Sequence, residues 1–156
     1  MRVPDGFQPG GRPAAPAPLD LVQDFVNTEI AVWAVDDIAT PELLAEWLQA
    51  RGLVASDATV DASSFVRARA LRVGADGPAV GPGGSGAARG LATIVAVVAA
   101  ARTGGVWERL KACRQETCGW LFYDSSRNRS SNWCSMQVCG GREKARAYRR
   151  RHEGAT

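Results

Sequence analysis

Four cysteines near the C-terminal end of the chain form two pairs with the same spacing. Cys113 and Cys118 are separated by four residues, and after fifteen further residues Cys134 and Cys139 repeat that separation. Two short knuckles of this kind can wrap four thiolates around one ion, and zinc accepts sulfur ligands readily. The spacing therefore predicts a Zn²⁺ site. We expect it to be structural, because four protein ligands leave no open position for a catalytic water.

Other uses of four cysteines remain open at this point. A separation of four residues is looser than the common separation of two, so the same thiols could form disulfides, stay free or hold an iron–sulfur cluster. Residues 1–18 contain no continuous apolar stretch of the kind that directs export. We therefore expect a cytoplasmic protein, in whose compartment reductants keep thiols reduced and favour the metal.

The aromatic residues beside the cysteines have two interpretations. Residues 119–124 read GWLFYD and predict a strand. Trp120, Phe122 and Trp133 are expected to pack around the metal, because such a small module has little else to bury. If exposed, Trp120 or Tyr123 could instead stack on an unpaired RNA base.

Basic residues follow in two groups that suit an anionic partner. A polar turn over 125–131 presents two arginines, whose like charges repel one another unless an anion such as phosphate lies nearby. Residues 140–152 read GGREKARAYRRRH and predict a helix that could enter a major groove, with a solvated basic tail as the alternative. We expect double-stranded DNA as the partner, bound by Arg127, Arg129, Arg142, Lys144, Arg146, Arg149 and Arg150.

The charge distribution divides the chain into two parts. Residues 1–99 hold seven arginines against eleven acidic residues, a net charge of −4. Residues 100–156 hold twelve basic against five acidic residues, a net charge of +7, so the two parts are expected to face different partners. The longest apolar run, residues 91–101, is shorter than the roughly 20 residues of a membrane-spanning helix, and we expect no membrane partner.

The first half of the chain predicts a small helical domain after a leader. Residues 1–18 are rich in Pro and Gly and predict a flexible segment. Apolar residues at three- and four-residue steps predict a helix over 19–33. Thr40 followed by Pro41 predicts the start of a second helix, which ends before Gly52.

A β-hairpin and a buried helix are expected next, which makes the fold class α+β. Residues 65–73, FVRARALRV, alternate apolar with basic residues and predict one arm of the hairpin, with the return arm from residue 78. Residues 81–90 predict a flexible glycine-rich connection, and residues 91–102 a buried helix. The predicted divisions are a leader over 1–18, a helical domain over 19–105, and a four-cysteine module over 106–152 that ends in the basic helix.

The sequence CGWLFYDSSRNRSSNWCSMQVCGGR resembles the C-terminal zinc finger of the CGNR family. Residues 20–53 are similar to the ABATE domain that accompanies this finger, through FVNT at 25–28 and EWL at 46–48. The resemblance implies a transcriptional regulator and a pocket in the N-terminal domain, with Asn27 and Trp47 as candidate pocket residues. The positions that match the finger are Cys113, Cys118, Trp120, Phe122, Tyr123, Asp124, Ser126, Arg127, Asn128, Arg129, Trp133, Cys134, Ser135, Met136, Cys139, Gly140 and Arg142.

The chain departs from this family pattern in two places. Gly141 stands where the family has its signature Asn, so any contact made by that amide is missing, although the four cysteines remain. The passage from Leu53 to the expected hairpin near Phe65 is also short, which implies an ABATE domain of reduced size.

Three classes of function are compatible with these residues. The leading hypothesis is a zinc-dependent DNA-binding regulator whose acidic N-terminal part senses a small molecule or forms a homodimer. The second is an accessory protein whose basic finger docks on an acidic protein surface. The third is an enzyme using Asn27, Glu29 or Asp36, which we do not expect because no Ser/His/Asp set or cofactor loop is visible and His152 is terminal.

Overall fold

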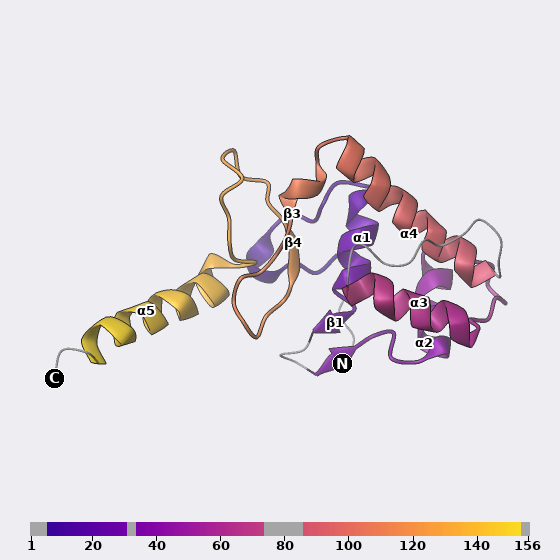
Figure 1. Ribbon diagram of the computed structural model, residues 1–156, viewed down its shortest axis with the longest axis horizontal. Helices are drawn as coiled ribbons and strands as arrows, with labels where there is room; N and C mark the ends of the chain where they lie inside the picture. Colours follow the sequence, from indigo (N-terminus) through magenta and orange to yellow (C-terminus); the bar gives the residue numbers. More distant parts are fainter. Residues whose placement is uncertain (1–5, 31–33, 74–85, 154–156) are drawn as a thin grey trace.

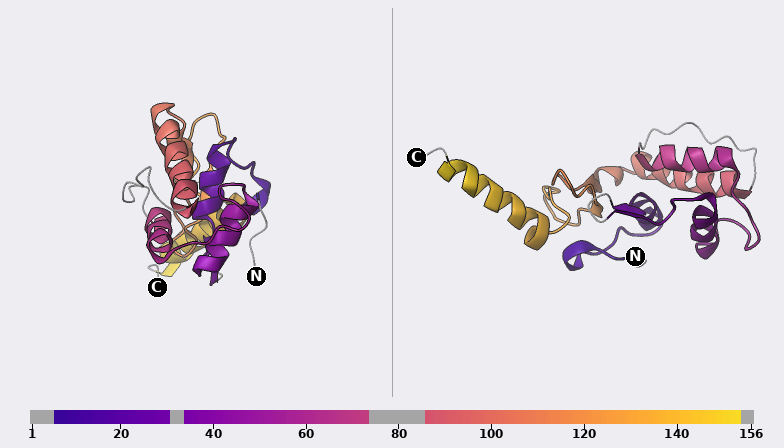
Figure 2. Two further views of the ribbon diagram at one scale, coloured as in Figure 1. Left: turned by 90° about the vertical axis from the view of Figure 1, so that its right-hand side faces the viewer. Right: turned by 90° about the horizontal axis from the view of Figure 1, so that it is seen from below.

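The computed structural model describes residues 6–30, 34–73 and 86–153 of the chain. Its helices gather at one end of the molecule and the cysteine module forms the middle, from which the last helix projects at the other end (Figure 1). The right-hand view in Figure 2 shows the same elongated arrangement. The elements in order are η1 (Pro9–Gly11), α1 (Leu19–Val26), β1 (Glu29–Ile30), β2 (Val35–Asp36), α2 (Pro41–Ala50), α3 (Ala62–Val73), α4 (Gly86–Thr103), η3 (Trp107–Arg109), β3 (Leu110–Ala112), β4 (Leu121–Tyr123), η4 (Met136–Gly140) and α5 (Gly141–Glu153).

These elements confirm the α+β class and several of the predicted helices. The Thr40 side chain caps α2 by accepting a hydrogen bond from the Leu43 backbone, with Pro41 in the first turn as predicted. α4 contains the predicted buried helix and begins earlier, at Gly86. α1 ends at Val26, short of the predicted residue 33, and residues 31–33 lie outside the described part of the chain.

The β-hairpin expected from residue 65 is wrong, because residues 62–73 form helix α3. The alternation of apolar and basic residues suggested a strand, but Ser64, Ala68 and Leu71 recur at steps of four and three residues and are buried on one helical face. Asp61 caps this helix through hydrogen bonds from the backbone and hydroxyl of Ser64. The expected return arm from residue 78 and residues 81–85 of the glycine-rich connection lie outside the described residues.

Two small antiparallel sheets complete the secondary structure. In the first, β1 pairs with β2 beside the end of α1, with Glu29 opposite Asp36. In the second, β3 pairs with β4 in the cysteine module, with Lys111 opposite Phe122. The second sheet therefore brings the two sides of the first cysteine pair together, because Cys113 follows β3 directly and Cys118 precedes β4 closely.

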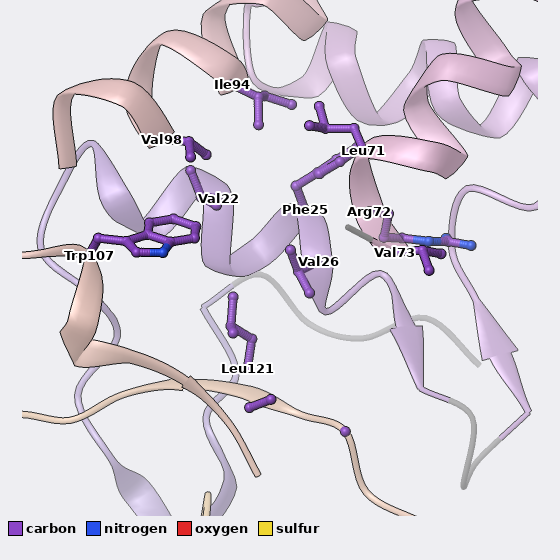
Figure 3. A pocket seen from close by; sticks show the side chains of 12 residues that line it. Val22, Phe25, Val26, Leu71, Arg72, Val73, Ile94, Val98, Trp107 and Leu121 are labelled. Atoms are coloured by element: carbon purple, nitrogen blue, oxygen red, sulfur yellow. The ribbon is translucent and has the colours of Figure 1, made fainter. Parts of the chain in front are cut away.

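The side chain of Asn27 joins the helical part to β4. Its Nδ2 donates to the Leu121 carbonyl at 2.8 Å, and its Oδ1 accepts from the Leu121 backbone N–H at 2.8 Å. One amide thus satisfies both backbone groups of Leu121, as a neighbouring strand would. Leu121 itself lies beneath α1, near Val26 (Figure 3). The two parts of the chain therefore share one continuous structure.

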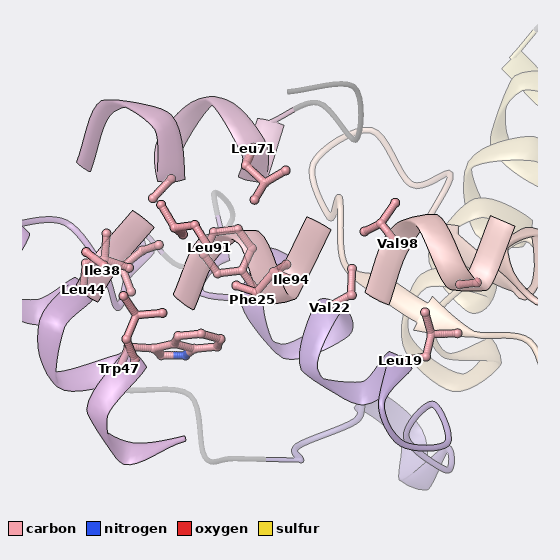
Figure 4. Packing of buried hydrophobic residues seen from close by; sticks show 14 of the residues in the cluster. Leu19, Val22, Phe25, Ile38, Leu44, Trp47, Leu71, Leu91, Ile94 and Val98 are labelled. Carbon is pink, nitrogen blue, oxygen red and sulfur yellow. The ribbon is translucent and has the colours of Figure 1, made fainter. Parts of the chain in front are cut away.

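The main core lies among α1, α2, α3 and α4. Phe25 of α1 meets Trp47 of α2 at a ring-centroid distance of 5.4 Å, and Leu91 and Ile94 of α4 pack beside Phe25 (Figure 4). By length and composition α4 could cross a membrane, but its buried side chains face this core. Gly90 permits the close approach of α4, because a Cβ there would lie 3.1 Å from Val54 and 3.2 Å from the Leu53 carbonyl.

We predict that Asn27→Ala lowers the free energy of unfolding by about 2 kcal/mol, because the substitution leaves the Leu121 N–H without an acceptor and its carbonyl with only the longer contact from Gln23 Nε2, at 3.2 Å. Urea unfolding of the zinc-loaded protein would measure the change. Asn132→Ala is the matched control, since Asn132 is exposed and its loss should change stability by less than about 0.5 kcal/mol. Equal effects of the two substitutions would contradict the joining role of Asn27.

Candidate metal centre

The four cysteine side chains converge on one point within the C-terminal module. Their four Sγ atoms all lie within 4.8 Å of one another, and Cys113, Cys134 and Cys139 are buried while Cys118 is half-buried. Cys134 Sγ lies 3.7 Å from Cys118 Sγ and 3.6 Å from Cys139 Sγ. A disulfide bond is only about 2.05 Å long. All four thiols are therefore free.

This cluster has the size of a cage for one tetrahedral ion. Zn–S bonds of about 2.3 Å in a tetrahedron separate neighbouring sulfur atoms by about 3.8 Å. The sulfur–sulfur distances of 3.6 and 3.7 Å match that separation closely. An iron–sulfur cluster would place several irons and sulfides between the same thiolates and would need a wider cage. The residues present fit Zn²⁺ as a structural ion, with no ligand position left open.

Crowding of the thiols shifts their pKa values in opposite directions. A hydrogen bond from Cys134 lowers the pKa of Cys118 to about 5, against the effect of burial. The same contact, together with burial, raises the pKa of Cys134 far above its ordinary value. Burial is also the largest cause that raises the pKa of Cys139 to about 12. An ion that takes four thiolates must therefore displace protons that the cluster otherwise retains.

Local backbone contacts turn the cysteine side chains inward. The Cys118 N–H donates to the Gln115 carbonyl at 2.9 Å, and the Cys113 N–H donates to the Trp120 carbonyl at 2.8 Å. Gly119 follows Cys118 with a φ of +63°, a left-handed conformation that glycine adopts at little cost. The second knuckle is closed by the Gly140 N–H, which donates to the Ser135 carbonyl at 3.0 Å. Contacts of the backbone thus shape both loops.

The aromatic residues pack as the sequence predicted. Trp120 and Phe122 are buried in the cluster that contains the cysteines, and Trp133 packs against it half-buried. Trp133 lies so close to Gly140 that a Cβ at Gly140 would come within 3.2 Å of the indole. Because Trp120 is only 3% exposed, it offers no platform for stacking on an RNA base.

A buried carboxylate holds the loop over residues 125–131. Asp124 is fully buried, and its Oδ2 accepts from Lys111 Nζ at 2.7 Å and from the Ser131 N–H at 2.9 Å, while its Oδ1 accepts from the Ser126 N–H at 3.0 Å. Burial alone would raise the pKa of Asp124, but the contacts with Lys111 and Ser126 outweigh it and hold the pKa well below its usual range. Lys111 Nζ also donates to the Arg129 carbonyl. The loop over residues 125–131, which we call the arginine loop, is therefore fixed at its base.

The segment over residues 6–18 lies against the cysteine module, although the sequence predicted a flexible leader. Arg12 donates from Nε to the Cys134 carbonyl at 2.8 Å and from Nη2 to the Trp133 carbonyl at 3.1 Å. Its guanidinium also lies 4.8 Å from the centre of the Phe122 ring. These anchors come from residues more than a hundred positions away, so composition alone could not reveal them. We call residues 6–18 the N-terminal strap.

Several residues that support the site were missed by the sequence interpretation. Arg12 was hidden in a segment rich in Pro and Gly, and Gln115 and Lys111 had no motif around them. The only signal for Asp124 was its place in the family match, which said nothing of its contacts. Each donates a hydrogen bond to, or accepts one from, a backbone group of the two knuckles or of the loop over residues 125–131.

The predicted nucleic-acid residues lie on exposed parts of this module. Arg127 and Arg129 are exposed on the loop that Asp124 holds, and Arg129 also lies 3.8 Å from the exposed Glu108. Of the predicted residues on α5, only Arg146 is half-buried, where it pairs with Glu143 at 3.0 Å. The exposed residues of α5 from the predicted set are Arg142, Lys144, Arg149 and Arg150.

The structure places Asn27 and Trp47 in different contacts. Asn27 is occupied by Leu121, and Trp47 is buried in the main core with the Arg51 guanidinium 3.9 Å from its ring centre. Two cavities in the described part of the chain, of about 310 and 210 Å³, are lined by other residues. Their agreement with the family pattern is explained by packing and by the joining contact.

Comparison with protein families gives two overlapping matches. The CGNR zinc finger matches residues 109–152, and the ABATE family, described as "Putative stress-induced transcription regulator", matches residues 19–117, more than half of the chain. The chain belongs to the ABATE family. Its ABATE domain is followed by a CGNR zinc finger, and the description of the family is that of transcription regulators. Comparison with curated proteins and with solved structures gave no match.

The structure explains how the CGNR finger tolerates its altered signature. Gly141 has an ordinary helical conformation, with φ −63° and ψ −43°, at the junction of η4 and α5. A Cβ there would meet only the Met136 carbonyl, at a van der Waals distance of 3.7 Å. Asn would therefore fit, and its replacement by Gly leaves the metal ligands in place.

We predict that the ABATE–CGNR chain binds one Zn²⁺, and that Cys134→Ala abolishes this binding while Ser125→Ala, at an exposed loop position, does not. Native mass spectrometry would count the ions. Because the pKa values of Cys134 and Cys139 are raised from an ordinary value that already lies above 7, both thiols keep their protons at pH 7; binding there should release at least two protons, and affinity should rise with pH. Calorimetry in buffers of different ionisation enthalpy would measure this release, and proton-independent binding would contradict it.

We also predict that Asp124→Asn destabilises the finger by roughly 3 kcal/mol, because it leaves the Lys111 ammonium without its carboxylate partner in a partly buried position. Chemical unfolding would measure the loss, and hydrogen exchange should accelerate at the Ser126 and Ser131 amides. Asp57→Asn, at an exposed position of the ABATE domain, is the control. Exchange that stays slow at both serines would show that the loop is held by other contacts.

Proposed function

We propose that this chain is a zinc-dependent transcription regulator that acts in the cytoplasm by binding double-stranded DNA through its CGNR finger. The zinc site holds the finger together, and the arginines around it contact phosphates. The ABATE domain senses a small molecule or mediates dimerisation. Membership of a transcription-regulator family and the four-cysteine site support the general role, and the position of the basic residues supports the DNA contacts.

The observation that carries this proposal is the position of α5. The helix extends away from the rest of the molecule (Figure 1, Figure 2), and none of its described side chains is buried. A helix of 13 residues without an apolar face is only marginally stable in water by itself. A polyanion that neutralised its arginines would remove their mutual repulsion and stabilise the helix.

The arginines of α5 are spaced to present one positively charged face. Arg142, Arg146, Arg149 and Arg150 are related by steps of four, seven and eight residues, which place them on one side of an α-helix. A single α-helix fits the major groove of B-DNA, where arginine can contact both phosphates and base edges. Arg146 is oriented by its ion pair with Glu143, and this pairing offsets part of its positive charge.

The loop with Arg127 and Arg129 belongs to the cysteine module in the middle of the molecule, from which α5 projects (Figure 1). From residue 125 to residue 153 the chain holds eight Lys or Arg residues and two Glu residues, a net charge of +6. Residues 125–153 thus concentrate positive charge in a chain whose net charge is only +3. Because Asp124 fixes the base of the loop, the loop can position its two guanidiniums with little loss of entropy on binding.

We predict that the double substitution Arg149→Ala and Arg150→Ala weakens binding to a labelled duplex and makes its salt dependence shallower by about 1.8 in the slope of log K against log salt, or about 0.9 for each lost phosphate contact. Fluorescence anisotropy across a salt series would measure this slope. The matched control is Arg67→Ala with Arg89→Ala, which removes two exposed arginines from the ABATE domain.

Equal effects of the two double variants would mean that only total charge matters and would contradict the role of α5. Competition with single-stranded RNA provides a further check, since RNA should displace the duplex poorly when Trp120 is buried. Preferred binding of RNA would redirect the proposal from DNA to RNA.

A further inference from the structure

A cavity of about 310 Å³ lies between the ABATE helices and the zinc finger. Figure 3 shows the lining side chains of α1, α3 and α4 on one side and Trp107 and Leu121 on the other. Val73, which is 83% exposed, marks its opening to solvent. An apolar cavity of about 150 Å³ holds one benzene ring, so this cavity accommodates roughly twice that bulk. The lining residues are Val22, Phe25, Val26, Leu71, Arg72, Val73, Ile94, Val98, Trp107, Ala112, Gly119 and Leu121.

Among the described residues that line the cavity, Arg72 is the only charged one. Its side chain is 2% exposed, with Nη1 2.6 Å from Asp36 Oδ1 and Nη2 2.9 Å from Glu29 Oε2. Figure 3 shows the Arg72 side chain extending past Val73 and away from Trp107 and Leu121, so that Nε, the first nitrogen along it, is the one nearest those side chains. Within the described part of the chain, this Nε has no hydrogen-bond partner. A buried donor without an acceptor is unfavourable, and a ligand oxygen would satisfy it.

The surroundings of Arg72 exclude an anion as the preferred ligand. Two carboxylates already face the guanidinium, and Arg72 holds the pKa of Asp36 below its usual value against the effect of burial. The exposed Arg69 adds a weaker positive influence at Asp36. A carboxylate ligand would meet these negative groups and could use only one N–H, without the paired contact that arginine normally offers it. A neutral oxygen acceptor suits the single free donor.

We propose that this cavity binds a neutral, mostly apolar small molecule with the bulk of two fused rings and one carbonyl or ether oxygen, which accepts a hydrogen bond from Arg72 Nε. Because Trp107 and Leu121 belong to one wall and α1, α3 and α4 to the other, the ligand contacts both the finger and the ABATE helices. Its use as an effector site rests on the proposed DNA-binding function. If the ligand changes the affinity of the protein for DNA, DNA must change the affinity of the protein for the ligand by the same factor. Binding of the ligand itself does not rest on that function.

The test uses 1-tetralone as the probe, titrated into the zinc-loaded full chain without DNA. Calorimetry should show one site, with tetralone bound roughly five-fold more tightly than the matched hydrocarbon tetralin, the effect of one hydrogen bond. The anion 1-naphthoate should bind more weakly than tetralone. In NMR spectra tetralone should shift the indole N–H signal of Trp107, which lines the cavity, and leave that of Trp47 in place.

Variants provide the second arm of the test. Val98→Phe fills the cavity and should weaken tetralone binding more than ten-fold, whereas Val66→Phe, at an exposed position of α3 outside the lining, should leave it unchanged. If Val98→Phe fails to fold, the Trp107 signal and the ratio of the affinities for tetralone and tetralin still test the proposal. No binding of tetralone, equal binding of tetralin, tighter binding of naphthoate or an unshifted Trp107 would each overturn the proposal. None of these results bears on whether the finger binds DNA.

Discussion

The confinement of four thiols within 4.8 Å of one another is the constraint on which the rest of the finger depends. Ionised sulfur atoms at this separation repel strongly, and neutral ones contribute little attraction to hold the chain in place. A divalent cation reverses this balance, because it attracts every thiolate at once. The four cysteines lie next to the hairpin of β3 and β4, the arginine loop and the start of α5. Their positions are therefore consequences of one coordination sphere.

The ABATE domain and the finger are joined by contacts that neither could make alone. Asn27 supplies strand-like hydrogen bonds to β4, and Leu121 packs against the main core of the ABATE helices. The two family matches overlap over residues 109–117, which include β3 and Cys113. The seam between the parts is thus a region of shared structure rather than a linker. A change on either side of this seam can reach the other through packed side chains.

Local chemistry explains which features could be predicted from the sequence. The cysteine spacing indicates its own ligand set, and Thr40 with Pro41 marks a helix start through contacts within one turn. The residues of α3 were misinterpreted because alternating arginines suggested a strand, while the cap at Asp61 and the buried face through Ala68 were overlooked. Asn27 could be matched to a family but not assigned its role, since Leu121 is distant in sequence. The same holds for the cavity, whose walls come from five separate segments.

The N-terminal strap has a consequence for how the protein is made. Arg12 emerges from the ribosome long before Cys134 and Trp133, whose carbonyls it contacts across 122 and 121 positions of sequence. Chains fold progressively from the N-terminal side during synthesis. The strap must therefore wait, without its final partners, until the second knuckle has been translated and has bound its ion. Metal supply at that moment decides when Arg12 gains its partners, so zinc limitation would prolong exposure of the N-terminal strap to proteases.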